Sequence, residues 1–404
     1  MTRILPPTAW REREGLRELL AGLGSGEGLI RFVGGAVRDT LCGTDVKDVD
    51  CATSLAPDAV IDRIRAAGFT AVPTGILHGT VTAVIPSGPI EVTTLRHDVE
   101  TDGRHAVVAF TDDWRADAAR RDFTINALSA DPIDGSIHDY FGGLDDLDAG
   151  IVRFIGTPLD RIAEDHLRIL RFFRFHARFG RGAPDPAALA ACVERANDLM
   201  ALSRERIADE LTKLLGVADP VATVRLMLDK GIFRPILPEI EADGVDRLAR
   251  LVGREAVASV AGDPLRRLGA LLPQDGSIAA GIAQRLKMSR AAARRLEQTA
   301  ATSDEPPRAI AYRFGADVAI DLLLRGSARD ADLAAIFASL SGWERPRLPM
   351  GGGDLISRGL KPGPVVAATL QAIERRWIAE DFPGAARIDV LKEEELARVR
   401  RDQG

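Results

Sequence analysis

Apolar residues along this chain follow two different patterns. Up to about residue 156, short apolar runs with strand-like alternation are broken by glycine and proline turns. From Pro158 onward, apolar residues recur at spacings of three and four, which is typical of amphipathic helices. We therefore expect an α+β domain over residues 1–156, followed by helices to the end of the chain.

The first domain is predicted to contain both helices and strands. Helices are expected over residues 8–23, 36–41 and 57–68, and strands over residues 29–33, 69–72, 79–85, 90–95 and 151–155. Residues 96–113 are polar and charged around a glycine, and we expect them to form a mobile loop.

The helical part of the chain shows one long helix and one clear linker. A single helix is expected over residues 161–179, and a Ser-capped helix begins after Ser203. The segment PRLPMGGG, residues 346–353, is the clearest late linker. We expect domain boundaries near residues 156, 215 and 345.

The first candidate chemistry follows an apolar run that ends at Gly34-Gly35. After a short helix the chain resumes as Asp48-x-Asp50, and in a strand these two carboxylates share a face with Cα atoms about 7 Å apart. Such a pair suits Mg²⁺, which takes one or two carboxylates plus substrate phosphates. The glycine turn offers backbone N–H groups to a triphosphate, and Arg38 a charge-assisted contact. A lone D-x-D or double glycine also occurs without such roles.

The second candidate is the segment ARRDFTINAL, residues 119–128. Its apolar residues can pack, which leaves Arg120, Arg121, Asp122 and Asn126 to be explained. Two adjacent arginines usually form a solvated surface. Beside a triphosphate, however, arginine binds phosphate and sugar oxygens bidentately.

The third candidate is the pair Asp165 and Arg168, which are neighbours on the surface of the helix expected there. One alternative is an ordinary ion pair worth a few tenths of a kcal/mol. The other is base recognition, because aspartate only accepts and arginine only donates. Such a pair would match the pairing edges of cytosine and adenine and mismatch guanine and uracil, at about 1–3 kcal/mol per buried unsatisfied group. Glu164 is expected to orient Arg168, four residues on.

These motifs together resemble one family. GGAVRD followed by DVKDVDCATS, then RRDFTINAL, DYFGGL and EDHLR, stand in the order found in the class II tRNA nucleotidyltransferase and poly(A) polymerase family, which includes the bacterial CCA-adding enzymes. LSRERIADEL resembles the neck motif of that family. The motifs cover about residues 30–215, and the remainder shares only the helical character.

The resemblance implies a fold and an activity. It implies a polymerase-β-like nucleotidyltransferase head with a small mixed sheet over residues 1–156, then an all-helical neck (157–215), body (216–345) and tail (346–404) that binds tRNA. It also implies template-independent addition of C and A to the 3′ end of tRNA from CTP and ATP, with Mg²⁺ as cofactor and pyrophosphate released.

Site residues follow from the same resemblance. Asp48 and Asp50 are expected to hold the metal, and Glu91 is the candidate third carboxylate, although a charged residue in a strand often just faces solvent. The nucleotide is expected to contact Gly34, Gly35, Arg38, Arg120, Arg121, Asp122, Asn126, Asp165, Arg168, Arg171 and Arg174. Of these, Asp122 and Asn126 would shape the ribose side, and Asp165 and Arg168 would select the base.

Composition changes this picture only slightly. A net charge of −6 argues against a protein that coats nucleic acid but allows a local RNA-binding surface, and neither DNA nor a membrane is an expected partner. Charged residues 11–14, the lack of a long apolar run and three cysteines without a C-x-x-C pair predict a cytoplasmic protein. No histidine follows His176, so a His-Asp phosphohydrolase domain is not expected.

Alternatives share the same motifs. The chain could be a poly(A) polymerase, or an enzyme that adds only CC or only A to tRNA. In a different class, it could be a tRNA-binding protein with a dead catalytic centre, although the intact carboxylates and arginines count against this.

Overall fold

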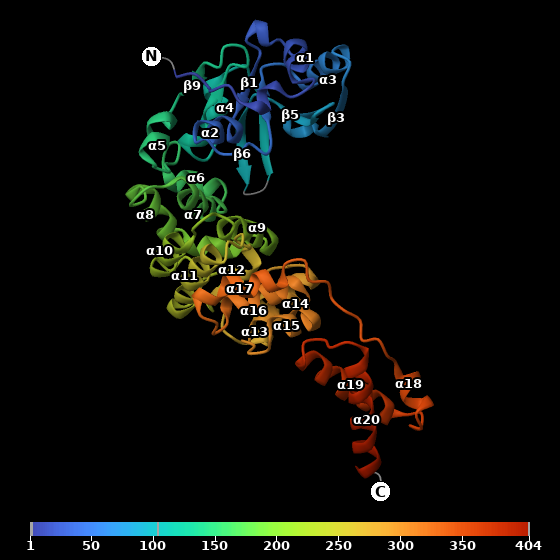
Figure 1. The fold of residues 1–404 in the computed structure, drawn as a ribbon. Coiled ribbons are helices and arrows are strands. Elements are labelled where there is room, and N and C mark those ends of the chain that lie inside the picture. The colour runs from blue at the N-terminus through green and yellow to red at the C-terminus, as the bar shows by residue number, and fades with distance from the viewer. Residues whose placement is uncertain (1–2, 103–104, 403–404) are drawn as a thin grey trace. The chain divides into compact units, whose positions relative to one another are not determined.

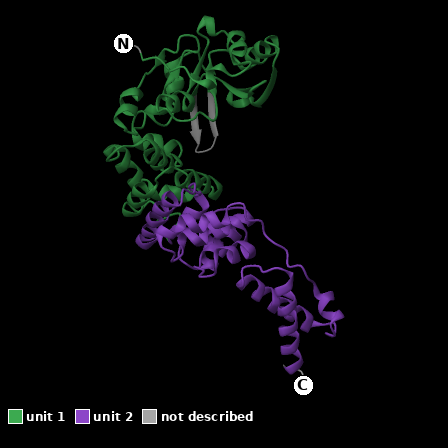
Figure 2. Ribbon diagram, viewed as in Figure 1, with its two compact units in different colours: residues 1–238 green, residues 239–404 purple. Residues whose placement is uncertain are grey.

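The computed structural model describes residues 3–102 and 105–402. The chain forms two compact units, unit 1 over Met1–Pro238 and unit 2 over Glu239–Gly404 (Figure 2). Every candidate site residue lies in unit 1. The four-domain division expected from the sequence stays a prediction.

Unit 1 is built on a mixed sheet of seven strands in the order β3-β4-β5-β2-β1-β8-β9 (Figure 1). The strands are β1 (Ile30–Val33), β2 (Asp50–Thr53), β3 (Thr70–Gly75), β4 (Thr80–Ile85), β5 (Gly88–Thr94), β8 (Ser129–Ala130) and β9 (Ile137–His138). Strands β2 and β5 run parallel, and the other neighbours are antiparallel. The small mixed sheet is therefore confirmed.

Apolar side chains on this sheet form the core of the head. Phe32, Val81, Ile90 and Val92 are fully buried or nearly so, as is Ile64 on α3. The helices of this part are α1 (Leu16–Gly22), α2 (Gly35–Leu41), α3 (Pro57–Ala66) and α4 (Trp114–Ala119), and 3₁₀ turns occur at Ala9–Glu12, Ser25–Glu27, Ile76–His78 and Thr124–Asn126. The expected helices over 36–41 and 57–68 and the strands over 69–95 are confirmed.

Two predictions for the head are wrong. Residues 8–23 form a 3₁₀ turn and then α1, because Gly15 between them adopts a left-handed φ of 84°. The expected loop over 96–113 is largely an antiparallel hairpin of β6 (Arg96–Asp102) and β7 (His105–Phe110), whose backbone pairing outweighs its polar composition. Residues 103–104 lie outside the described residues, and α4 begins at Trp114.

The segment after the head is helical, as expected. Its helices are α5 (Gly143–Ala149), α6 (Pro158–Glu164), α7 (Arg168–Phe179), α8 (Pro186–Glu194), a 3₁₀ turn (Ala196–Ala201), α9 (Arg204–Leu215) and α10 (Val221–Asp229). The strand expected over 151–155 is wrong, because only an isolated bridge joins Phe154 to Phe123.

The single helix expected over residues 161–179 is also wrong. It is two helices, α6 and α7, separated at Asp165, which adopts an extended backbone with φ −154° and ψ 106°. The Asp165 carboxylate accepts the backbone N–H of Leu167 at 3.1 Å. Aspartate competes with helical hydrogen bonds in this way, so the chain breaks at the acidic residue.

Unit 2 consists of helices in the part of it that the structure describes. They are α11 (Ala242–Val257), α12 (Pro264–Leu271), α13 (Gly276–Arg285), α14 (Arg290–Thr299), α15 (Pro307–Phe314), α16 (Ala316–Arg325), α17 (Asp330–Leu340), α18 (Gly352–Ser357), α19 (Pro364–Ala379) and α20 (Ala385–Asp402). Aromatic packing of Tyr312, Trp377 and Phe382 joins α15 to the last helices. No helix among the described residues has the length and apolar character needed to span a membrane.

Candidate active site

The glycine turn joins β1 to α2 in a conformation that requires glycine. Gly34 has a left-handed φ of 64°, and a Cβ there would lie 2.9 Å from Nη1 of Arg121. Its N–H donates to the carbonyl of Leu128 at 3.0 Å, so this group is not available to a triphosphate. Gly35 begins α2, where the first N–H groups have no partner within the helix. The turn therefore brings the backbone close to Arg121, and of the two glycines Gly35 is the better candidate for binding a phosphate.

The expected carboxylates lie at one end of the central strands. Asp50 is the first residue of β2, and Glu91 stands beside it as its partner on the parallel strand β5. Asp48 precedes the strand, so the prediction that both aspartates share one strand is wrong. All three residues are exposed. Although Asp50 is exposed as a residue, protein atoms displace water around its carboxylate. This desolvation and the nearby charge of Glu91 raise the pKa of Asp50 above its ordinary value, against the opposing charge of Arg121, and Asp48 adds to the rise more weakly.

A cavity of about 390 Å³ lies beside the glycine turn. Most of its lining is polar, and six arginines face only two aspartates around it. The lining residues are Gly34, Gly35, Arg38, Arg120, Arg121, Asp122, Asn126, Asp165, Leu167, Arg168, Arg171, Phe175 and Arg206. The surplus of positive charge suits an anionic ligand such as a triphosphate.

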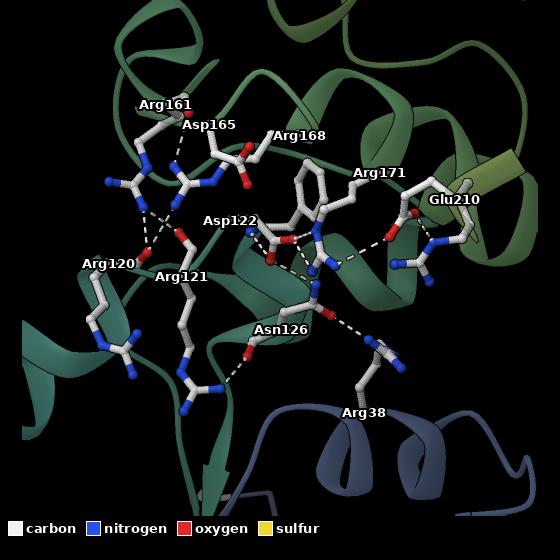
Figure 3. A network of polar contacts seen from close by, with 12 residues as sticks. Arg38, Arg120, Arg121, Asp122, Asn126, Arg161, Asp165, Arg168, Arg171 and Glu210 are labelled. Atoms are coloured by element: carbon white, nitrogen blue, oxygen red, sulfur yellow. Dashed lines mark hydrogen bonds and ion pairs between the residues drawn. The ribbon is translucent and has the colours of Figure 1, made fainter. Parts of the chain in front are cut away.

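Asp122 connects the loop after α4 to helix α7 (Figure 3). Its carboxylate accepts Nε and Nη2 of Arg171 at 2.8 and 2.5 Å, and the side-chain amide of Asn126 at 2.9 Å. Burial alone would raise the pKa of Asp122, but Arg171 and the hydrogen bonds outweigh burial and lower it. Asp122 therefore stays ionised and fixes both Arg171 and Asn126 at the cavity.

Arg38 is buried at the base of the same group. Its guanidinium donates to Asp39 at 2.8 Å and to the Asn126 side chain, and stacks on Phe179 at 4.4 Å. Burial is the main cause of the lowered pKa of Arg38. Arg38 lines the cavity, as expected for a nucleotide contact, but its other role is to hold Asn126.

Asp117 and Arg161 position the adjacent arginines. The buried carboxylate of Asp117 accepts Arg120 Nε at 3.0 Å and Arg121 Nη2 at 3.3 Å. Arg161 on α6 donates to the backbone carbonyls of Arg120 and Arg121 at 2.5 and 2.8 Å (Figure 3). Side chains and backbone are therefore both fixed, and the two guanidinium groups face the cavity.

Asp165 and Arg168 both line the cavity but do not pair with each other. Arg168 donates to Glu164 at 2.5 Å, which is the orienting contact expected for Glu164. Asp165 instead accepts Nη2 of Arg206, on α9, at 2.7 Å. An i,i+3 ion pair between Asp165 and Arg168 is thus excluded. Each of the two side chains is instead oriented by a different partner, Arg206 for Asp165 and Glu164 for Arg168.

Arg174 does not line the cavity. Its Nε donates to Oε2 of Glu210 at 2.6 Å, and its guanidinium stacks on Phe175 at 4.2 Å. Glu210, on α9, is 2% exposed and lies 3.7 Å from Arg171 as well. Arg174 therefore supports the cavity wall from behind, and its expected contact with the nucleotide stays a prediction.

Comparison with known proteins identifies the family. Residues 30–153 match the model of the "Poly A polymerase head domain", and residues 183–243 match "Probable RNA and SrmB- binding site of polymerase A". The "CCA tRNA nucleotidyltransferase 1, mitochondrial" of Mus musculus is 34% identical over 90% of this chain and 86% of its own. The chain belongs to the CCA-adding enzyme family, the CCA tRNA nucleotidyltransferases.

Other CCA-adding enzymes agree with this. The Danio rerio enzyme is 41% identical over 65% of this chain, and the alignment spans only 60% of that relative's length. The crystal structure of the Bacillus stearothermophilus CCA-adding enzyme in complex with CTP matches 96% of this chain and 99% of its own at 28% identity, with a TM-score of 0.75. The polymerase-type head followed by helices is therefore confirmed.

Nucleotidyltransferases of this family generally use a divalent metal. No group of three or more histidine, cysteine, aspartate or glutamate side chains among the described residues forms a ready-made metal cage. A two-carboxylate platform fits Mg²⁺ all the same, because that ion takes substrate phosphates and water as its remaining ligands. Asp48 and Asp50 have the right donor chemistry. Burial first, and then the neighbouring carboxylates, raise the pKa of Asp50, and a bound cation would offset both effects.

Several residues of this site are not found by sequence reasoning. Arg206, Asp117, Arg161 and Glu210 hold the expected residues in place, and Phe175 completes the wall. Arg161 and Phe175 lie within the segment expected to form the base-selecting helix. Their position in that segment could have marked them as candidates for the site. Arg206 and Glu210 lie more than 35 residues from their partners. Both belong to LSRERIADEL, which resembles the neck motif, but that motif does not indicate which residues they contact.

Proposed function

We propose that this chain adds C and A nucleotides to the 3′ end of tRNA without a nucleic-acid template, using CTP and ATP and releasing pyrophosphate. One observation supports this proposal most directly. Asp165 and Arg168, the candidates for base recognition, line the same cavity as Gly35, Arg121 and the other candidates for phosphate binding. A nucleoside triphosphate bound there would place its base and its phosphates against different parts of one wall.

The reaction joins the 3′-hydroxyl of the RNA to the α-phosphate of the nucleotide and breaks the bond to pyrophosphate. Asp48 and Asp50 would hold Mg²⁺, which when bound supplies activation of the hydroxyl and charge neutralisation on the triphosphate. Glu91, beside Asp50 on β5, adds negative charge to this platform. Arg120 and Arg121 would bind the phosphates and sugar through guanidinium groups that Asp117 holds in place.

Base selection would use Asp165, at the break between α6 and α7, and Arg168, the first residue of α7. Arg168 keeps donors for the base while Glu164 fixes its orientation, and Asp165 supplies the acceptor. A donor and an acceptor in these positions match cytosine and adenine and leave guanine and uracil with unpaired polar groups. Asp122 and Asn126 would shape the ribose side, where Arg171 and Arg38 hold them.

The RNA partner and the compartment are part of the same proposal. Residues 183–243 match an RNA-binding family model, which supports a tRNA partner that contacts the helices after α7. All three cysteines, Cys42, Cys51 and Cys192, are free thiols, which fits a reducing compartment and so the cytoplasm.

Primer extension tests the proposal. The purified chain receives Mg²⁺ with CTP and ATP, singly and together, and a tRNA that lacks CCA or ends in CC. We expect three additions to the first tRNA and one to the second. A long adenosine ladder would make the enzyme a poly(A) polymerase, and a stop after CC or addition of A alone would make it a partial enzyme. No incorporation would leave a tRNA-binding protein.

A further inference from the structure

Unit 2 contains an arginine-rich cavity of its own. It has a volume of about 420 Å³ and lies among α11, α12 and the end of α16. Arg247, Arg250, Arg254 and Arg325 line it, and Asp330 is the one carboxylate in its lining. None of its lining residues belongs to the candidate active site, which lies in unit 1.

Two of these arginines hold the fold together. Arg247 donates to the carbonyls of Ala270 and Leu272, both at 2.9 Å, at the end of α12. Arg254 donates to the carbonyls of Gly326 and Ala328, at 2.6 and 2.9 Å, just past α16. The last carbonyls of a helix need such donors. Each of these arginines also has a carboxylate nearby, Asp243 for Arg247 and Asp330 for Arg254.

The other two arginines make no ion pair in the part of the chain that the structure describes. Arg250 is exposed, and Arg325 is half-buried with one donor on the carbonyl of Thr299. In the part of the chain that the structure describes, neither guanidinium lies within 4 Å of a carboxylate oxygen. Burial, together with the charge of Arg247, lowers the pKa of Arg325 to about 10, and the charge of Asp321 offsets this only in part. The cavity therefore holds more positive charge than its own carboxylates neutralise.

We propose that this cavity binds a phosphate group through Arg250 and Arg325. Arginine offers paired N–H donors that match the oxygens of a phosphate, and charge-assisted hydrogen bonds of this kind are among the stronger ones. The volume lies within the range of sites for small molecules. The phosphate is either part of a small molecule, such as pyrophosphate, or part of an RNA backbone. The second source rests on the proposed function, and the first does not.

Gly253 offers a way to test the cavity without removing an arginine. It is an exposed residue of α11 in the cavity lining, and a Cβ there would meet nothing within 4 Å. Glycine is the poorest non-proline residue inside a helix, so Gly253→Glu and Gly253→Gln should both fold. The two variants have nearly the same shape, and only Gly253→Glu adds a negative charge to the cavity.

Calorimetric titration of the full chain with sodium pyrophosphate, without divalent metal and at constant ionic strength, is the first arm. We expect Gly253→Glu to weaken binding about tenfold or more relative to Gly253→Gln, the scale of one lost charge-assisted contact. Any pyrophosphate bound in unit 1 is common to both variants and cancels. The double variant Arg250→Gln/Arg325→Gln should reproduce the loss, while Arg294→Gln, an exposed arginine on α14, should bind as the original chain does.

The second arm measures the affinity of a tRNA transcript that lacks CCA. Loss of pyrophosphate binding with unchanged tRNA binding supports a small phosphorylated ligand. Loss of tRNA binding alone supports a backbone phosphate. Equal behaviour of Gly253→Glu and Gly253→Gln in both arms overturns the proposal. Primer extension with the same proteins measures nucleotide addition, which depends on the candidate active site in unit 1. Failure of the proposed function can therefore be told apart from failure of this phosphate site.

Discussion

Two regions of this molecule combine arginines with carboxylates, and they differ in balance and burial. In unit 2, Arg266, Arg267 and Arg295 meet Glu255, Asp321 and Asp263. The two central carboxylates, Glu255 and Asp321, are 2% and 1% exposed. In unit 1, six arginines and two aspartates line a cavity of about 390 Å³.

The group in unit 2 pairs each of its three arginines with carboxylates of the same group. Asp321 alone accepts Arg266 at 2.8 Å and Arg295 at 2.7 and 2.8 Å, so three arginine N–H groups point at its two buried oxygens. The cavity in unit 1 keeps unpaired donors and an excess of positive charge toward solvent. The number of charged residues is therefore a poor guide to function, whereas the excess charge around an accessible cavity is a good one.

The largest expected effect is at the metal carboxylates. Asp48→Ala/Asp50→Ala should lower nucleotide addition by about 10³-fold or more, because metal-ion catalysis supplies several kcal/mol to the transition state. Single-turnover incorporation of labelled CTP measures it. Asp45→Ala, an exposed residue of the same segment, is the control and should be fully active. If the double variant still adds nucleotides, the metal site has been placed wrongly.

The next effect tests the other side of the comparison. Asp321→Ala should lower the free energy of unfolding of unit 2 by about 3–5 kcal/mol, because buried Arg266 and half-buried Arg295 each lose the carboxylate that they share. Denaturant unfolding measures this. Asp332→Ala removes an exposed pair with Arg329 and should cost no more than about 1 kcal/mol. If both variants lowered the free energy of unfolding by the same amount, buried and exposed ion pairs would not differ in their contribution to stability.

Removal of a carboxylate at the cavity in unit 1 should change the choice of nucleotide instead of the stability of the fold. Asp165→Ala should reduce the preference for CTP and ATP over UTP and GTP by about 1–3 kcal/mol, the cost of a mismatched polar group. Relative kcat/KM values for the four nucleotides measure the preference. Asp209→Ala, which removes an exposed pair with Lys213, is the control. Unchanged nucleotide choice in Asp165→Ala would show that another group selects the base.

The smallest effect concerns pH and the carboxylate pair at β2 and β5. Because the pKa of Asp50 is raised in the folded chain, its contribution to stability is present below the unfolded pKa and is lost as pH rises through the folded pKa. Asp50→Asn should therefore raise Tm at pH 7 without metal, by no more than about 2 °C, and have no such benefit near pH 3. Added Mg²⁺ should stabilise the original chain more than the variant. A lower Tm for Asp50→Asn at pH 7 would contradict this.

Local pattern was sufficient for much of the fold and part of the site. Periodicity and the conformational freedom of glycine both act over a few residues. Together they predict β1, the glycine turn, α2 and the strand that starts at Asp50. Local pattern failed at residues 96–110, where polar composition suggested a loop and cross-strand backbone bonds formed a hairpin. It also failed at Asp165, where a side-chain hydrogen bond broke the helix.

By itself, the sequence picked out the candidate residues for the proposed chemistry, because the motifs are short and their residue types follow from the ligands they suit. Only the tertiary structure decided how those residues are held. Arg206 reaches Asp165, Glu210 reaches Arg174, and Asp122 reaches Arg171, across 36 to 49 positions of chain. A charged side chain pairs with whichever opposite charge the fold brings within reach. The packing of α7 against α9 and against the loop after α4, not spacing along the chain, sets these distances.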